Sequence, residues 1–441
     1  MITTARKESE IARAPAKKTS AVRSFPWVFA EVLLSVLLTV LCLETAFALA
    51  GVGEEEYLKR DDILGWSPIP GKHITWRREG FSRLAVNKYG MVDIERSLKK
   101  QTGTFRIAVL GDSNVESLQV PRDESFCALI EKALGTELKQ NVEVLNFGVS
   151  AYNSGQFYLR LKNLAWRFHP DLVIAAIAVD STKKLAPQQG DGFFSARPEF
   201  SLSEKGELLF DYRAQERWTS SPAGLRVKAT SWLREHSRIW GVVSIAVEQA
   251  QNWYEGLKRG YIRWGATVTN KKTAFDTADH DASLYGVFAE PGKHARLEIP
   301  HALSHDEQEE LMRCWPIHEA IIARMKNECD ASRCPMVVLR LPCVNGHDNA
   351  PESQLLKSTA ARLRVPFIDA RDAFVKAMRE RDEALFYSVH LSPAGHRVLS
   401  DTIVGNLLPL IASKHEDGKD PCRTDALKAT DNNKPAQGRL R

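Results

Sequence analysis

Two residues of this chain have the types and settings that nucleophilic chemistry needs. Ser113 closes a Gly-Asp-Ser turn directly after the apolar run 105–110, and His390 precedes Ser392-Pro393, a pair typical of a helix start. A serine at the carboxyl end of a buried strand lies in the crevice where parallel sheets bind ligands. A loop histidine there is suited to act as its general base. Taken separately, each fits an ordinary role better: Ser113 in a simple strand-to-helix turn, and His390 on the solvated surface.

The pattern around these residues is that of an α/β fold. Continuous apolar runs alternate with helical patterns, which is typical of a parallel sheet covered by helices on both faces. The expected strands are 105–110, 142–147, 172–179, 336–341 and 365–368, and the expected helices are 123–138, 154–168, 372–381 and 393–412. The sequence therefore predicts a three-layer αβα sandwich.

Other segments precede, interrupt or follow this alternation. Residues 185–305 leave after a strand's carboxyl end, carry a helical pattern around 223–257, and are expected to form a mainly helical cap beside the crevice. Residues 53–103 show few regular patterns and predict an irregular stem ahead of an α/β domain at 104–412. The polar tail at 413–441 is expected to be disordered.

The first fifty residues carry a membrane-directing pattern. Residues 1–26 form a basic tail, and 27–50 are almost wholly apolar and long enough to cross a bilayer as a helix. The basic flank predicts a cytoplasmic N-terminus, a single span in the inner membrane and an extracytoplasmic, periplasmic C-terminal domain. A cleaved signal peptide is the alternative, because Ala48-Leu49-Ala50 resembles a small-x-small cleavage site. The long basic region favours the uncleaved anchor.

Composition argues against several classes of function. The formal net charge of +5, from 60 basic and 55 acidic residues, gathers largely at the two ends, so nucleic-acid binding is not expected. The histidines lack metal-ligand spacing and no further glycine-rich nucleotide loop is present, so we expect no metal and no organic cofactor. Cys127 is expected in the core. Cys329 and Cys334 are close enough in sequence for a small disulfide loop outside the cytoplasm.

Four motifs, in this order, resemble the SGNH, or GDSL, hydrolase superfamily of serine esterases and deacetylases. They are Gly111-Asp112-Ser113, Asn146-Phe147-Gly148-Val149-Ser150, Pro170-Asp171-Leu172-Val173-Ile174 leading into Asp180, and His390-Leu391-Ser392-Pro393-Ala394-Gly395-His396. The stem also looks like that of membrane-anchored bacterial members, in Leu64-Gly65-Trp66, Pro70-Gly71 and Asn87-Lys88-Tyr89-Gly90-Met91. The resemblance covers roughly residues 60–185 and 330–412 and implies a flavodoxin-like parallel sheet.

The resemblance also implies roles for individual residues. Ser113 is the expected nucleophile, and His390 is the expected base that activates it. The backbone N–H groups of Ser113 and Gly148 are the expected donors to the tetrahedral oxyanion. A glycine at 148 would let the backbone approach the substrate, although on its own it fits a turn glycine better. His396 falls inside the last helix and is expected to be structural.

The oxyanion side of the site departs from the family pattern. The family usually has Asn-Asp after the third strand, where this chain has Val179-Asp180, so the asparagine donor is missing. Asn153 and Asn114 are the candidates to replace it, and Asp112 and Asp180 are possible supporting residues. Loss of one such donor typically lowers the rate by about 100- to 1000-fold.

The acid of the expected triad is missing as well. The family usually has an aspartate two or three residues before the catalytic histidine, where this chain has Tyr387 and Ser388. Ser388 can accept the imidazole N–H, but it cannot stabilise the imidazolium as a carboxylate does. Asp382 and Asp369 are alternative acids, and a dyad supported by a backbone carbonyl is a third arrangement.

The sequence as a whole predicts an exported, membrane-anchored serine esterase that removes acyl groups, acetyl groups first, from a carbohydrate. Its expected partners are an acylated small molecule or polysaccharide and the membrane; the sequence identifies no protein partner. One alternative is an O-acetyltransferase on envelope polysaccharide, in which a sugar hydroxyl replaces water. The other is a catalytically degenerate relative that binds glycan or partner proteins, and the two missing polar groups favour it.

Overall fold

The computed structural model describes most of the chain in two compact units, Met1–Val52 and Gly53–Arg441. The described residues are 25–50, 56–77, 79–178, 193–195, 197–211, 213–244, 305–342, 350–380, 383–387 and 389–416, together with 52, 185, 246–247, 250 and 254. The basic tail up to residue 24, residues 255–304 of the insertion and the tail from 417 lie outside them.

The described part of the first unit is essentially one apolar helix. Helix α1 (Phe25–Ala50) contains a 25-residue segment, Pro26–Ala50, with a mean hydropathy of 2.4. None of the residues in its most apolar stretch is buried. Its length and composition are sufficient to cross a membrane, and an N-terminal signal sequence has the same properties.

The second unit is built on a five-stranded parallel sheet. Its strands are β5 (Thr104–Leu110), β6 (Asn141–Asn146), β7 (Leu172–Ile177), β10 (Met336–Arg340) and β11 (Phe367–Asp369). They lie in the order β11-β10-β7-β5-β6, which is the flavodoxin-like order that the sequence predicts. Strands β6 and β7 pair with opposite edges of β5. The strand order therefore reverses at β5: the chain adds β6 on one side of it and β7, β10 and β11 on the other.

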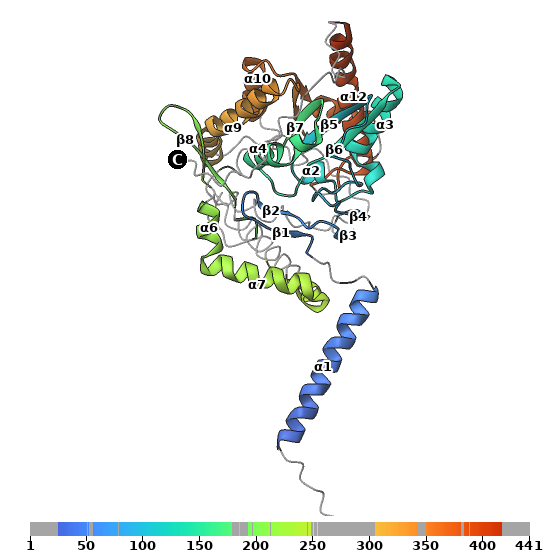
Figure 1. Cartoon of the computed structure of the whole chain (residues 1–441), viewed down its shortest axis with the longest axis vertical. Helices are drawn as coiled ribbons and strands as arrows, with labels where there is room; N and C mark the ends of the chain where they lie inside the picture. Colours follow the sequence, from blue (N-terminus) through green and yellow to red (C-terminus); the bar gives the residue numbers. More distant parts are fainter. Residues whose placement is uncertain are drawn as a thin grey trace, which may run out of the picture. The chain divides into compact units, whose positions relative to one another are not determined.

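Helices cover both faces of this sheet (Figure 1). One layer contains α3 (Phe126–Leu138), α11 (Arg371–Glu380) and α12 (Pro393–Glu416), and the other contains α4 (Ser154–Asn163), α9 (His305–Ala331) and α10 (Ala350–Arg362). Side chains alternate along β5, so Ile107 and Val109 pack with the first layer while Ala108 and Leu110 pack with the second. The predicted three-layer sandwich is confirmed.

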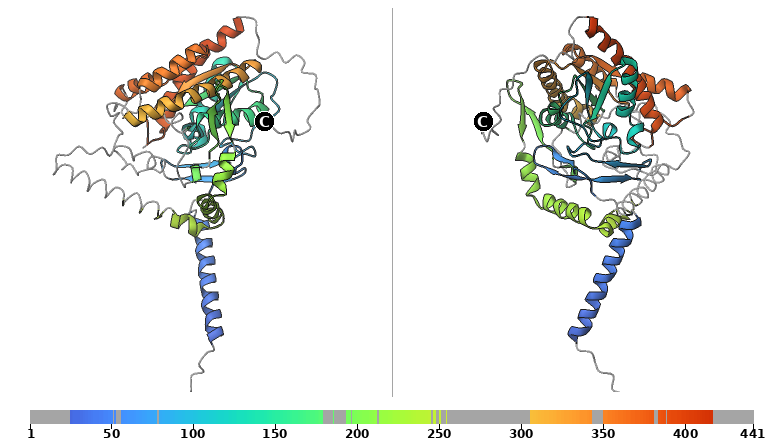
Figure 2. Two further views of the ribbon diagram at one scale, coloured as in Figure 1. Left: turned by 90° about the vertical axis from the view of Figure 1, so that its left-hand side faces the viewer. Right: turned by 45° about the vertical axis from the view of Figure 1, so that its right-hand side comes forward.

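The stem is more regular than the sequence predicts. It contains two antiparallel hairpins, β1 (Leu58–Asp61) with β2 (Gly65–Pro68) and β3 (His73–Trp76) with β4 (Ser82–Ala85). Both hairpins lie beside the α/β core in the two views of Figure 2. The strands have only four residues each, too short for a period-two pattern to stand out from turn residues in the sequence.

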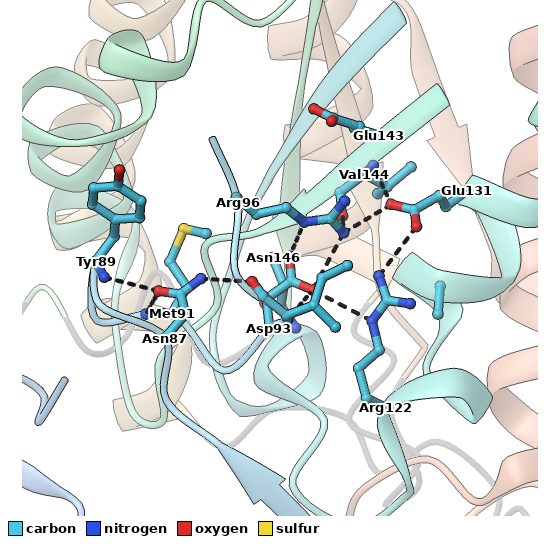
Figure 3. Close-up of polar contacts among 12 residues, drawn as sticks. Asn87, Tyr89, Met91, Asp93, Arg96, Arg122, Glu131, Glu143, Val144 and Asn146 are labelled. Carbon is cyan, nitrogen blue, oxygen red and sulfur yellow. Dashed lines mark hydrogen bonds and ion pairs between the residues drawn. The ribbon is translucent and has the colours of Figure 1, made fainter. Parts of the chain in front are cut away.

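An ion network fastens the end of the stem to the sheet and to α3 (Figure 3). The guanidinium of Arg96 donates to Asp93 at 2.9 Å, to Glu131 on α3 at 2.8 Å and to the carbonyl of Val144 on β6 at 3.1 Å. Arg122 binds the same two carboxylates, at 3.3 and 3.2 Å. Because Arg96 and Asp93 are almost fully buried, these contacts fix the stem against the α/β core.

The described part of the insertion begins with a hairpin and continues as helices. The hairpin pairs β8 (Glu199–Leu202) with β9 (Leu208–Asp211), and α6 (Arg213–Thr219) and α7 (Pro222–His236) follow. The helix expected at about 223–257 is interrupted at Ser237, whose backbone is extended and whose N–H bonds the carbonyl of Leu233. The described part of the insertion is therefore helical with a β-hairpin at its start.

The cysteines that the structure describes in the sheet domain are buried. Cys127 packs in the core, as predicted. Cys329 and Cys334 are also buried and are not joined by a disulfide, so the expected small disulfide loop is absent from the structure. Cys329 belongs to the last turn of α9, and the N–H of Cys334 closes that turn on the Cys329 carbonyl at 2.9 Å.

Removal of the central cation of the ion network should loosen the stem. Replacement Arg96→Met leaves the buried Asp93 carboxylate with one cationic partner fewer, and we expect a loss of about 3 kcal/mol in the free energy of unfolding. Chemical denaturation of the full chain measures this change. Lys88→Met is the matched control, because its pair with Glu95 is well exposed on both sides, and it should cost less than about 1 kcal/mol. Equal costs would contradict a clamping role for Arg96.

Candidate active site

A tight turn at the end of β5 presents Ser113. The side chain of Asp112 caps the one-turn helix α2 (Ser113–Glu116) by accepting the N–H of Asn114 at 3.0 Å. A Cβ on Gly111 would lie 2.1 Å from the Val115 side chain, so only glycine permits this close turn. Ser113 is therefore the first residue of α2 rather than its cap, and its side chain is not used by the turn.

A second small turn carries His390. An isolated bridge joins Phe386 and Leu391, and the N–H of Tyr387 donates to the carbonyl of His390 at 2.9 Å. Helix α12 begins directly afterwards, with the hydroxyl of Ser392 accepting the N–H of Gly395 at 3.2 Å, as the sequence predicts. The histidine is thus held on a hairpin-like loop before the last helix.

The structure brings these two residues together from positions 277 apart in the sequence. The Nε2 atom of His390 lies 2.9 Å from the Oγ of Ser113, a hydrogen-bond distance. The His390 side chain is mostly buried, with 16% of its surface exposed. This distance is that required of a base that takes the proton of a serine nucleophile.

The carboxylate that the sequence lacks beside His390 comes from the stem. Oε2 of Glu79 bonds Nδ1 of His390, and Oε1 of Glu79 accepts the N–H of Val389 at 3.1 Å. A carboxylate in its ionised form only accepts, so this contact assigns the proton to Nδ1 and leaves the lone pair of Nε2 facing Ser113. Glu79, His390 and Ser113 form a continuous acid–base–hydroxyl chain, the arrangement that activates a serine.

Close packing holds the turn that carries Glu79. The next residue, Gly80, has a φ of 63°, and a Cβ there would lie 2.3 Å from the Gln119 carbonyl oxygen and 2.7 Å from the Tyr387 ring. The hydroxyl of Ser82 donates to the carbonyl of Leu118 at 2.5 Å. The stem turn is therefore wedged between the segment that follows α2 and the loop that carries His390.

The expected oxyanion donors differ in their availability. The N–H of Ser113 has no hydrogen-bond partner among the described residues. The N–H of Gly148 donates to the Oδ1 of Asn146 at 2.9 Å. A Cβ on Gly148 would lie 2.3 Å from the backbone nitrogen of Glu116, so the glycine allows this loop to approach α2. Glycine is thus required at position 148 because the backbone there packs against α2.

The two asparagines considered as substitute donors have different positions. Asn114 follows Ser113 directly, is half-buried, and makes a long 3.3 Å contact from its Nδ2 to Asp112. Asn153 is buried and caps α4, where it exchanges hydrogen bonds with Gln156 in a capping box. Asn153 therefore serves a structural role, whereas Asn114 is adjacent to Ser113 in the sequence.

Of the remaining predicted residues, the structure describes only Asp369, which binds elsewhere. Asp180 and Ser388 lie outside the described residues, as does Asp382. Asp369 pairs with Arg340 at 3.1 Å and accepts the Arg371 N–H.

His396 is structural, as expected from its place inside α12. Its Nδ1 accepts the N–H of Phe126 at 3.2 Å, and the two rings stack. Burial, helped by the neighbouring His390, lowers the pKa of His396 to about 3. The residue therefore remains neutral beside the site at physiological pH.

Glu79 is the residue that the sequence reasoning missed. It lies 311 positions before His390 in a segment expected to be irregular, and no spacing rule connects the two. The absence of an aspartate at 387 and 388 was the one available signal, since it required the acid to come from another segment.

Comparisons with known proteins give only distant likenesses. No protein-family model matches the chain, and no curated protein matches it. Among solved structures, Axe2, an acetylxylan esterase from Geobacillus stearothermophilus, aligns with a TM-score of 0.36 and 11% identity over 70% of this chain and 96% of that one. LAE5, an alpha/beta hydrolase enzyme from the metagenome of Lake Arreo, Spain, aligns with a TM-score of 0.34 and 11% identity over 70% of this chain and 97% of that one.

The close packing around Gly80 leads to a prediction about stability, with a second glycine of the stem as control. Gly80→Ala and Gly71→Ala both place a side chain at positive φ, 63° and 77°, but an added Cβ meets nothing within 4 Å at Gly71. We expect about 1 kcal/mol of destabilisation for Gly71→Ala, from backbone strain alone. Gly80→Ala should cost a further 1 to 3 kcal/mol, roughly, because backbone and ring must move apart. Equal losses in chemical denaturation would show that the stem turn is not wedged as described.

Proposed function

We propose that this protein is a serine esterase of the SGNH type that removes acetyl groups from a carbohydrate. The single observation that carries the proposal is the chain of contacts from Glu79 through His390 to Ser113. The three groups have the types, the order and the hydrogen-bond geometry of a charge-stabilised catalytic triad. The fold supports the proposal, because Ser113 follows the carboxyl end of the strand beyond which the sheet order reverses.

The first half of the proposed reaction forms an acyl-serine. The Oγ of Ser113 attacks the ester carbonyl carbon while Nε2 of His390 takes the hydroxyl proton. Glu79 stabilises the imidazolium that results and keeps the ring in the productive orientation. The proton then passes from His390 to the oxygen of the leaving sugar as its bond to the acyl carbon breaks.

The second half releases the acid. Water attacks the acyl carbon, His390 takes a proton from that water, and Ser113 leaves with the proton returned to it. The N–H of Ser113 is open to donate a hydrogen bond to the oxyanion in both halves. The N–H of Gly148 becomes the second donor when it releases the Oδ1 of Asn146 and donates to the substrate oxygen instead.

The stem carboxylate favours catalysis over a purely binding role. The alternative of a catalytically degenerate relative is based on two missing polar groups, the oxyanion asparagine and the aspartate of the triad. Glu79 is a substitute for the aspartate. A protein that only bound glycan would have no chemical need for an aligned carboxylate, imidazole and hydroxyl. The carbohydrate part of the proposal comes from the resemblance to SGNH deacetylases.

We further propose that α1 anchors the enzyme as an uncleaved single span in the inner membrane, with the second unit on the extracytoplasmic side. The apolar length of α1 and the basic residues before it support this topology. The substrate would then be an acylated saccharide of the cell envelope.

Active-site labelling tests the proposed triad. The full chain in detergent should react with a fluorophosphonate probe, and Ser113→Ala and His390→Ala should abolish the labelling. Glu79→Gln should lower the labelling rate by about 10³-fold or more, because the amide cannot stabilise the imidazolium. Glu95→Gln, an exposed glutamate of the same stem, is the matched control and should label like the parent. A folded parent that does not label, or labelling that persists without Ser113, would overturn the esterase proposal.

The fate of the acetyl group separates hydrolysis from transfer. Incubation with an acetylated oligosaccharide should release free acetate at a rate that depends on Ser113 and Glu79. An unacetylated oligosaccharide in the same reaction should remain unmodified by mass spectrometry. Acetyl transfer to that acceptor, with little free acetate, would favour the acetyltransferase alternative over the hydrolase.

A further inference from the structure

A second buried carboxylate lies three residues after the nucleophile and takes no part in the triad. Glu116 is the last residue of α2, and Ser113 is the first. Its Oε2 accepts hydrogen bonds from the N–H of Ser150 at 2.9 Å, from the hydroxyl of Ser150 and from the hydroxyl of Tyr57 at 3.1 Å. Its Oε1 is buried and has no hydrogen-bond partner among the described residues.

These contacts tie the nucleophile helix to the turn after β6, the turn that carries Gly148. Ser150 is held on both sides, because its carbonyl also accepts the indole N–H of Trp66 at 3.0 Å. The following residue, Ala151, has a φ of 63°, a strained value for a residue with a side chain. A strained turn persists only where its surroundings fix it, and Glu116 and Trp66 supply that fixation.

The surroundings of Glu116 allow it to change charge near neutral pH. Burial raises its pKa from 4.5 to about 7, against the opposing effects of the hydrogen bonds from Ser150 and Tyr57 and the charge of Arg160. Three titratable or charged groups act on it. Tyr57 lies ahead of β1, Tyr152 lies in the turn before α4, and Arg160 lies on α4. Burial also raises the pKa of Tyr57, so that hydroxyl remains a donor throughout the neutral range.

We propose that Glu116 is a positioning residue whose ionised carboxylate holds the Ser150 turn, and with it the Gly148 backbone, in the arrangement that serves the oxyanion. Protonation of Glu116 loosens this hold and makes the site less active on the acid side of neutrality. The inference rests on the proposed esterase function and adds a regulating group to that same site.

The direction of the effect follows from the hydrogen bonds. Three donors converge on one oxygen, and hydrogen bonds to an ionised acceptor are roughly twice as strong as those to a neutral one. Above a pH of about 7 the carboxylate is ionised and the turn is firmly held. Below that pH the oxygen is part of a neutral carboxyl group, whose hydrogen bonds resemble those of a glutamine amide oxygen.

The test compares the full chain with Glu116→Gln across pH 5.5 to 8.5. The second-order rate of fluorophosphonate labelling is measured for both, and the ratio of parent to variant is plotted against pH, which removes titrations common to both proteins. We expect a ratio near one at the acid end and about fivefold higher at the alkaline end, with a midpoint near pH 7. Glu137→Gln, an exposed glutamate on α3, should give a flat ratio.

Tyr57→Phe provides an independent variant that keeps the packing and removes one donor. Because the Tyr57 hydrogen bond lowers the pKa of Glu116, its loss should move the midpoint of the pH dependence to higher pH. This variant decides the question if Glu116→Gln does not fold. A labelled parent whose ratio to Glu116→Gln is independent of pH, or a midpoint unmoved in Tyr57→Phe, would overturn the role of Glu116 alone. A folded parent that never labels would overturn the esterase proposal together with it.

Discussion

The hydrogen bond between Glu79 and His390 is the constraint on which the arrangement of the site depends. It joins a carboxylate from the stem to an imidazole that precedes the last helix, and the imidazole in turn faces the hydroxyl that follows the first core strand. A buried carboxylate is stable only where it accepts hydrogen bonds, and Glu79 accepts them from the imidazole of His390 and from the N–H of Val389. Three distant segments must therefore be folded together before any of the three groups is correctly placed.

That requirement explains why the stem is so firmly attached. Gly80 lets the stem turn reach the segment after α2, where no larger residue fits. Farther along, Arg96 and Arg122 bind Asp93 and Glu131, which fixes the stem end against α3 and β6 (Figure 3). A stem that served only as a spacer to the membrane would not need buried ion pairs of this kind, which are costly unless fully paired.

The fold was predictable from the sequence because its signals are local. An apolar run such as 105–110 predicts its own strand, and Ser392-Pro393 predicts the start of its own helix. The positions of Ser113 and His390 follow from those elements, because the carboxyl ends of parallel strands meet at one edge of a sheet. Glu79 was not predictable, since its role is created by a contact across 311 residues of chain and its own neighbourhood carries only turn residues.

At Gly148 the structure gives the missing side chain a different physical reason from the one that the sequence suggests. The sequence suggests that a missing side chain lets the backbone approach a substrate, whereas the structure uses that space for α2. The same close contact brings the Ser150 turn within reach of Glu116, so the glycine and the buried carboxylate belong to one arrangement. The stem takes part here as well, since Tyr57 and Trp66 donate to Glu116 and to the Ser150 carbonyl. Both sides of the proposed nucleophile, the side of His390 and the side of Gly148, are thus positioned by residues that precede the α/β sheet in the sequence, which makes the stem an integral part of the proposed site.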